Sequence, residues 1–463
     1  MPDPIVVTAD GAVRGRRDGD AHVFHAIPYA APPTGAARFT EPAPHPPWRG
    51  VRDATQPGPT APQPNRGGFG ALDMSPFFGQ GWIPGSDYLT VNVWAPPAAE
   101  QAPVMVFVHG GGFVAGSTRS PLYDGTAFAR DGVVLVTVTY RLGIAGFLSL
   151  PGAPDNRGLL DVVAALRWVR DNIGAFGGDP GNVTLFGQSA GATITAAVAA
   201  TPDAGRLIRR AIVQSGNGMG AFDREQAARV THAAAERLGI KPTLDDFARV
   251  SDERLVDVSG QLTGLDLRTT DRFDPLVGLS PFSIVLTRQA AETIGDEVPM
   301  LIGTNTEEGN LYLAPGGLLD TSTAADVHSL AARVDTDPAA LVARYRDRHP
   351  RAGWGELRSA ILGDALFGTG SRRLAQVHPA TTHRYEFGWR SASLDGRLGA
   401  AHAVELPFVF DRLHLGVLRG PRALLGPGEP PAALAAEMHG AWVGYARTGD
   451  PGWSQSVTHR FTG

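Results

Sequence analysis

The sequence has no cysteine, which excludes disulfide bonds, a thiol nucleophile and zinc sites with cysteine ligands. A chain without cysteine fits a reducing compartment. No apolar run reaches the roughly 18 residues that a membrane-spanning helix needs. The N-terminus also lacks the basic start and apolar run of a signal peptide. We therefore predict a cytoplasmic protein without a membrane anchor.

The sequence also lacks a large excess of either positive or negative charge. The formal net charge is −5, and no run of basic residues is longer than a pair, so we expect neither nucleic acid nor a membrane as a partner. The chain does have 463 residues and 43% hydrophobic side chains, which suffices for a large buried core. We find no repeat and no linker, and we describe residues 1–463 as one domain. The oligomeric state is not readable from the sequence.

Short apolar runs alternate with helical patterns along most of the chain. Residues 104–108 and 133–138 are rich in β-branched side chains, which is typical of strands buried on both faces. Residues 156–176 and 431–445 have helical spacing. Asp10-Gly11 and Asp18-Gly19 indicate N-terminal hairpins, and alternation over 88–94 predicts a strand with one buried face. The order predicts an α/β fold whose mostly parallel sheet has helices on both faces.

Residues 222–286 form the exception to this alternation. They carry polar helical patterns rich in Arg and Asp and contain no obvious strand of the sheet. We interpret the segment as a helical insertion that lies over the sheet. Such an insertion either supplies walls to a binding site or only covers the core.

The candidate nucleophile is Ser189 in a Gly-x-Ser-x-Gly pattern. The pattern alone is common in a glycine-rich chain, but here it follows the apolar run 183–186 and precedes a helix-prone stretch that starts near Ala190. A sharp strand-to-helix turn exposes the serine hydroxyl and tolerates only small residues two positions away. The alternative is a glycine-rich start of a helix with no chemistry.

A second glycine-rich loop, His109-Gly110-Gly111-Gly112, follows the run 104–108. Acyl transfer builds negative charge on the former carbonyl oxygen, and backbone N–H groups stabilise it. We predict that Gly111, Gly112 and Ala190 donate these N–H groups. The alternative is a dinucleotide-binding loop, but the glycine spacing misses that fingerprint by one residue. We interpret His109 as structural.

Several motifs resemble the type-B carboxylesterase family, the cholinesterase-like and bacterial p-nitrobenzyl-esterase-like members of the α/β-hydrolase fold. The resemblance covers nearly the whole chain. It rests on the motifs Ile27-Pro28-Tyr29-Ala30-Ala31-Pro32-Pro33, Leu89-Thr90-Val91-Asn92-Val93-Trp94, Tyr140-Arg141-Leu142-Gly143, Phe176-Gly177-Gly178-Asp179-Pro180 and Thr448-Gly449-Asp450-Pro451. It implies an α/β-hydrolase fold and an esterase that needs neither a metal nor an organic cofactor.

The resemblance also implies the acid and the base. Gly303-Thr304-Asn305-Thr306-Glu307-Glu308-Gly309 resembles the family's acid loop, in which the residue before the last glycine is the acid. That residue is Glu308, and Glu307 is the alternative. Eight histidines follow Glu308 in the chain. Among them, the surroundings of His402 resemble the family's histidine loop.

These residues predict a serine hydrolase that cleaves small carboxylic esters through an acyl-enzyme, with Ser189, His402 and Glu308 as the triad. Amides, carbamates and thioesters are alternative substrates of the same apparatus. A binding module without activity is the alternative from another class. The family usually has Glu before the serine, where this chain has Gln188, so we expect a weaker preference for cationic substrates. We predict that Gln188 and Phe113 belong to the substrate pocket.

Overall fold

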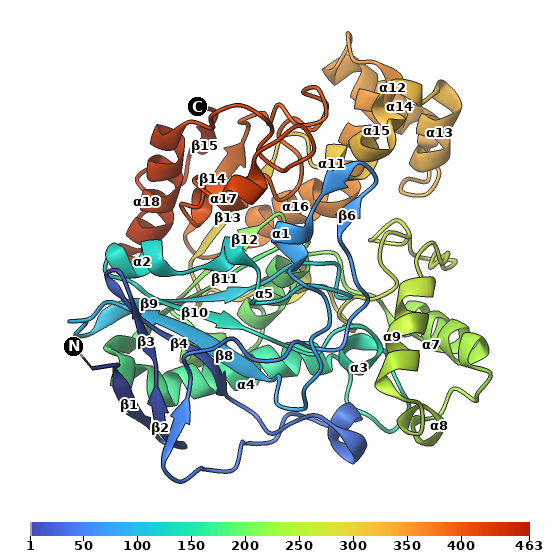
Figure 1. Cartoon of the computed structure of the whole chain (residues 1–463). Helices are drawn as coiled ribbons and strands as arrows, with labels where there is room; N and C mark the ends of the chain where they lie inside the picture. Colours follow the sequence, from blue (N-terminus) through green and yellow to red (C-terminus); the bar gives the residue numbers. More distant parts are fainter. Residues whose placement is uncertain (1) are drawn as a thin grey trace.

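The structure is a computed structural model that describes residues 2–463. Its centre is a ten-stranded sheet. Neighbouring strands from β15 to β10 pair parallel, whereas β8, β4 and β3 pair antiparallel. The order across the sheet is β15 (Thr458–Phe461), β14 (Thr382–Phe387), β13 (Met300–Asn305), β12 (Arg210–Gln214), β11 (Gly178–Gln188), β9 (Ala102–Val108), β10 (Val134–Val138), β8 (Thr90–Ala95), β4 (Ala21–Pro28) and β3 (Arg16–Asp18). The mostly parallel sheet is confirmed (Figure 1).

Helices cover both faces of the sheet because its central strands are apolar on both sides. Val106 of β9 packs in one core cluster with residues of α4 (Arg157–Asn172) and α5 (Ala190–Ala199). The next residue, Phe107, packs in a second cluster with residues of α2 (Thr126–Arg130) and α18 (Ala432–Thr448). Successive side chains of a strand point to opposite faces, so the clusters are the two sides of the sheet. Figure 1 shows α4 and α18 on opposite sides of it.

The predicted N-terminal hairpins form. β1 (Ile5–Thr8) and β2 (Gly11–Arg14) pair antiparallel and join β5 (Val51–Asp53) in a separate three-stranded sheet. β3 and β4 form the second hairpin and extend the main sheet. Gly11 and Gly19 have positive φ at the two turns, a conformation that glycine adopts without strain.

The prediction that the strand over 88–94 has one buried face is wrong. All six residues of β8 are buried, because β8 lies between β10 and β4 in the sheet. Its polar residue Asn92 is satisfied internally: Nδ2 donates to Thr137 Oγ1 at 3.1 Å, and Oδ1 accepts from the backbone N–H of Ala26 at 3.0 Å. Paired polar residues can therefore alternate with apolar ones inside a core.

Residues 222–286 contain α7 (Arg224–Leu238), α8 (Leu244–Ala248) and α9 (Asp252–Gln261). Asp223 and Gln226 form a capping box at the start of α7, and Gly239 ends it with a φ of 69°. Within this segment of the described chain no strand joins the main sheet. The division into one domain with this insertion stays a prediction.

A second helical segment, residues 310–377, lies between β13 and β14 and has no counterpart in the sequence-based prediction. It builds its own small core from Val327, Leu357 and Ile361, among others. Most of it is drawn in yellow-orange at the upper right of Figure 1. Its helices are α11 (Asn310–Leu313), α12 (Leu318–Thr321), α13 (Ala324–Ala331), α14 (Pro338–Arg348), α15 (Trp354–Gly363) and α16 (Thr369–Val377), with a π-helical turn, η5 (Asp364–Gly368), between the last two.

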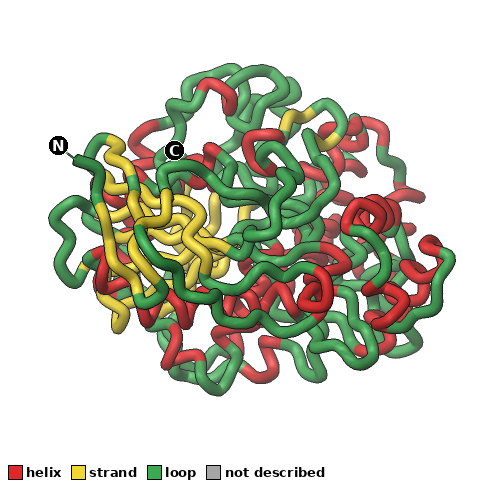
Figure 2. The backbone as a smooth tube through the Cα atoms, turned by 60° about the horizontal axis from the view of Figure 1, so that its bottom comes forward, coloured by secondary structure: helices red, strands yellow, loops and turns green. Residues whose placement is uncertain are grey.

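Short elements complete the chain, and Figure 2 shows the strands gathered on one side of the molecule. Within residues 2–463, none of the helices combines the length and the apolar character needed to cross a bilayer. The short elements are η1 (Gly35–Phe39), β6 (Gly68–Phe69), β7 (Leu72–Asp73), α1 (Ser75–Phe78), η2 (Pro121–Tyr123), α3 (Gly143–Phe147), η3 (Ile173–Phe176), α6 (Ala204–Leu207), α10 (Ala290–Thr293), η4 (Ala314–Gly316), α17 (Leu406–Val409) and η6 (Gly416–Leu418).

Candidate active site

Ser189 occupies the sharp turn between β11 and α5. Its φ of 58° and ψ of −123° are rare for a residue with a side chain. A Cβ on Gly187 would lie 2.5 Å from the backbone of Gly191, and one on Gly191 would lie 2.0 Å from the carbonyl oxygen of Val108. Only glycine fits on either side of the serine, so the turn has the geometry that the sequence predicts.

The loop after β9 leaves backbone donors free beside this turn. Gly111 and Gly112 have φ angles of 118° and 64°, and a Cβ on Gly111 would lie 1.8 Å from Ala115 O. Within residues 2–463, the N–H groups of Gly111, Gly112 and Ala190 have no hydrogen-bond acceptor. All three residues line the same cavity as Ser189. Unpaired N–H groups that converge on one cavity can stabilise an oxyanion.

His109 plays a structural part in this loop. Its ring stacks on Tyr140 at 4.6 Å between centroids, and Nδ1 donates to Gly110 O at 2.8 Å. Burial lowers the pKa of His109 to about 4. The first helical turn after the glycine loop is η2, so the loop does not open a helix as a dinucleotide-binding loop would.

Glu308 lies just beyond the end of β13 and is held by three donors. Its Oε1 accepts from Ser215 Oγ at 2.5 Å and from the backbone N–H of Asn305 at 2.7 Å. Its Oε2 accepts from His402 Nδ1 at 2.6 Å. Glu308 and His402 are 4% and 3% exposed, so this contact is shielded from water, which strengthens it.

The alternative acid, Glu307, points elsewhere. It forms an ion pair with Arg390, and its Oε2 accepts from the backbone N–H of Ala400 at 2.9 Å. Its own N–H donates to Ala400 O at 3.1 Å. Glu307 thus fastens the acid loop to the segment that carries His402, and only Glu308 touches the imidazole.

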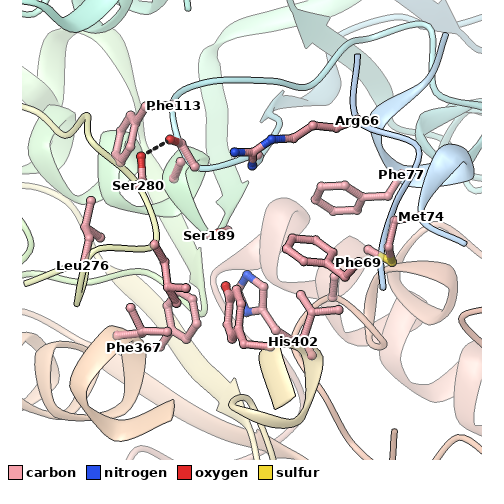
Figure 3. Close-up of a pocket in the computed structure, with 18 of the residues that line it drawn as sticks. Arg66, Phe69, Met74, Phe77, Phe113, Ser189, Leu276, Ser280, Phe367 and His402 are labelled. Atoms are coloured by element: carbon pink, nitrogen blue, oxygen red, sulfur yellow. Dashed lines mark hydrogen bonds between the residues drawn. The ribbon is translucent and has the colours of Figure 1, made fainter. Parts of the chain in front are cut away.

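The His402 ring is fixed on two sides. Its plane stacks on Phe367 at 4.1 Å between centroids and 7° between planes. Because Nδ1 donates to Glu308, Nε2 is the nitrogen with a free lone pair. In the described chain no hydrogen bond joins Nε2 to Ser189; the Gln188 amide nitrogen lies 3.1 Å from it instead. Ser189 and His402 nevertheless face one cavity (Figure 3).

The cavity has a volume of about 190 Å³ and mostly apolar walls. Phe113 is one of them and packs edge-on against Phe147. The segment 222–286 contributes Ser280, whose hydroxyl donates to Gly112 O at 2.5 Å. Most of the other lining residues come from three stretches that are distant in sequence: Arg66, Phe69, Met74, Phe77 and Phe78; Thr263, Leu276 and Leu279; and Leu311, Tyr312, Leu366 and Phe367. Thr193, Asn217 and Ala403 complete the lining.

Comparison with known proteins identifies the family of this chain. A sequence model described as the carboxylesterase family matches residues 2–461. The chain belongs to the carboxylesterase family. It is 37% identical to para-nitrobenzyl esterase of Bacillus subtilis (strain 168), over 97% of this chain and 91% of that protein. It is 35% identical to phenmedipham hydrolase of Pseudarthrobacter oxydans, over 97% and 90%.

The solved structures agree with the sequence relatives. A carboxylesterase of Geobacillus stearothermophilus superposes with a TM-score of 0.82 at 33% identity, over 97% of this chain and 92% of that one. The predicted resemblance and the α/β-hydrolase fold are thereby confirmed. This carboxylesterase is an enzyme that hydrolyses carboxylic esters.

One residue at the site, Phe367, carries no sequence signal that reasoning from motifs could use. Phe367 of this carboxylesterase reaches His402 from the π-helical turn η5, and π-turns inserted in helices are frequent at functional sites. Asn305 Nδ2 donates to Ala401 O and to Glu405 Oε2, each at 2.7 Å. Asn305 therefore ties the acid loop to the histidine loop.

Glu405 is a second buried carboxyl group near Glu308. Its side chain is fully buried, and burial, followed by the nearby charge of Glu308, raises the pKa of Glu405 to about 7.

Gln188 does not line the cavity wall; its amide lies against His402. In the described residues, no group of three or more His, Asp or Glu side chains is arranged to hold a metal ion.

Proposed function

We propose that this carboxylesterase uses Ser189 as the nucleophile, His402 as the general base and Glu308 as the acid that orients the imidazole. The observation that carries the proposal is the buried 2.6 Å contact between Glu308 Oε2 and His402 Nδ1, beside the strained turn of Ser189. A carboxylate in this position fixes the tautomer that leaves Nε2 free to accept a proton.

In the proposed reaction, His402 Nε2 takes the Ser189 proton as Oγ attacks the ester carbonyl. The N–H groups of Gly111, Gly112 and Ala190 then stabilise the oxyanion. Collapse of the tetrahedral intermediate breaks the carbonyl–alkoxy bond, and His402 gives its proton to the leaving alcohol. Water, deprotonated by the same nitrogen, then attacks the acyl-enzyme, the acyl–Oγ bond breaks, and His402 returns the proton to Ser189 Oγ as the carboxylic acid leaves.

Gln188 adds a step before the chemistry. In the free enzyme its amide N–H donates to His402 Nε2 at 3.1 Å, the lone pair that must receive the Ser189 proton. The proposed cycle therefore begins with exchange of Gln188 for Ser189 at Nε2. Catalytic hydrogen bonds are often poorly aligned in free enzymes and tighten when substrate binds.

The test is a Ser189→Ala variant assayed on p-nitrophenyl butyrate. We expect kcat to fall by about a million-fold, with an unchanged far-UV circular dichroism spectrum. Folded protein that keeps its turnover contradicts the proposal. Amide, carbamate and thioester analogues assayed beside the ester define the preferred bond.

The partner that this function requires is a small ester. We propose that Phe113 contacts the substrate as a wall of the pocket. Gln188 acts on the site only through its contact with His402. A cytoplasmic location and the absence of nucleic-acid and membrane partners stay predictions from the sequence.

A further inference from the structure

One cation lies in the apolar cavity of the proposed active site. Arg66 precedes β6 and lines the cavity together with Ser189 and His402. Figure 3 shows its guanidinium pointing into the cavity from the side of Phe77. An arginine in such surroundings loses hydration, and burial lowers the pKa of Arg66.

Arg66 has no partner within residues 2–463: it forms no ion pair or hydrogen bond and lies over no aromatic ring. The titratable group nearest to its cation, the Tyr312 phenol, is neutral at neutral pH because burial raises the pKa of Tyr312 well above its ordinary value. Two fully buried arginines of this chain, by contrast, have partners. Arg141 pairs with Asp161 at 2.7 Å, and Arg157 donates four hydrogen bonds to backbone carbonyls.

The cavity also lacks an anion of its own. No Asp or Glu is among the described residues that line it. Glu308 is engaged by three donors behind His402, and the residue before the nucleophile is the neutral Gln188. With apolar walls, the field of the guanidinium is weakly screened.

From this arrangement we infer that the preferred esters carry a carboxylate, and that Arg66 is the specificity-determining residue that binds it. The inference rests on the proposed function. A planar guanidinium can donate two parallel hydrogen bonds to a carboxylate, a pairing stronger than one between neutral groups. The substrate class is thus half-esters of dicarboxylic acids, or esters whose alcohol part bears a carboxylate.

Matched ester pairs test the inference. On the acyl side, p-nitrophenyl hexanoate is compared with mono-p-nitrophenyl adipate. On the alcohol side, phenyl hexanoate is compared with 4-carboxyphenyl hexanoate. The variants are Arg66→Met, which keeps apolar bulk, Arg66→Lys, which keeps charge, and Arg49→Met, which removes an exposed arginine outside the cavity.

For at least one pair, we expect Arg66→Met to lower kcat/KM on the anionic ester by about 10- to 100-fold, the size of a charge-assisted contact. On the neutral ester it should change kcat/KM by no more than about threefold. Arg66→Lys should fall between, and Arg49→Met should match the wild type. An unchanged ratio of anionic to neutral ester for both pairs overturns the inference.

The neutral esters separate the two proposals. Hydrolysis of neutral esters that depends on Ser189 but shows no Arg66-dependent ratio removes only the inference about carboxylates. Hydrolysis that persists in Ser189→Ala removes the proposed function itself. Thermal unfolding of each variant excludes loss of fold as the cause.

Discussion

At the scale of single residues, the neutral amide of Gln188 gives the site a hydrogen-bond donor that a glutamate would not provide. An amide N–H can donate to the lone pair of His402 Nε2 at 3.1 Å, whereas a carboxylate in the same place cannot donate at all. Gln188 also leaves the site with one negative charge fewer than the family's usual Glu.

Gln188→Glu is therefore expected to raise the preference for cationic esters. The ratio of kcat/KM for a trimethylammonium-bearing ester to that for its neutral isostere should increase by about tenfold, because the new charge lies near a cavity with mostly apolar walls. Gln188→Ala is the matched control, since it removes the amide without adding charge. An unchanged ratio in Gln188→Glu contradicts this reading.

Glu405 is the second informative residue, because its carboxyl is buried without a cation beside it. Burial raises the pKa of Glu405 to about 7 in the folded protein, from an ordinary value of 4.5. The folded state therefore holds this proton more tightly than the unfolded chain does. The stability that results is complete below pH 4.5 and is lost as the pH rises through about 7.

Glu405→Gln should remove this pH dependence while keeping an acceptor for Asn305. Between pH 5 and pH 8, the free energy of unfolding of the wild type should decline relative to the variant by on the order of 3 kcal/mol. Urea denaturation at both pH values measures it, with the exposed Glu100→Gln as control. Wild-type and Glu405→Gln curves that move together with pH contradict the expectation.

A residue of the site could be predicted from the sequence only where it lies in a recognisable motif. Ser189 could be found from small neighbours between a strand and a helix, and Glu308 and His402 from resemblance. Phe367 and Arg66 could not, because no motif surrounds them. Their positions beside the site follow from the packing of distant segments, which local sequence does not encode.

At the scale of elements, a buried ion pair fastens the end of β10 to α4. Arg141 and Asp161 are both fully buried and bonded at 2.7 Å, and the Arg141 N–H also donates to Asp161. The guanidinium further donates to the carbonyls of Arg38 and Thr40. The motif 140–143 is thus fastened both to α4 and to residues 38–40.

Asp161→Asn leaves the Arg141 cation buried without a counterion. We expect the free energy of unfolding to fall by about 3–5 kcal/mol. Asp171→Asn, on the same helix, breaks an exposed pair with Arg170 and should cost less than about 1 kcal/mol. Chemical denaturation compares the two, and similar losses in both variants count against this assignment.

The pattern of apolar residues predicted a strand correctly where both faces of that strand are buried among apolar side chains. Residues 104–108 and 133–138 were predictable as strands because apolar side chains fill both faces. Burial of β8 was not, because Asn92 mimics a solvent-facing position while its amide pairs inside the core. Residues 310–377 were not predicted as a separate segment, because the small core that holds their helices together joins positions far apart in the sequence.

At the scale of the whole molecule, the cavity is where distant parts of the chain meet. Its walls come from residues near 66–78, 263–280 and 311–367, while the nucleophile and glycine loop come from the sheet. The sheet therefore fixes the chemistry, and the inserted segments fix the shape and charge of the space. This division explains why the reaction was predictable from sequence and why most of the walls, apart from Phe113, were not.

Covalent labelling tests the central claim most directly. The enzyme is incubated with diethyl p-nitrophenyl phosphate, its residual esterase activity is followed, and its peptides are mapped by mass spectrometry. The account predicts one diethylphosphoryl group on Ser189 and loss of activity in proportion to it. Activity that disappears while Ser189 stays unmodified, or persists when Ser189 is fully modified, would contradict the account.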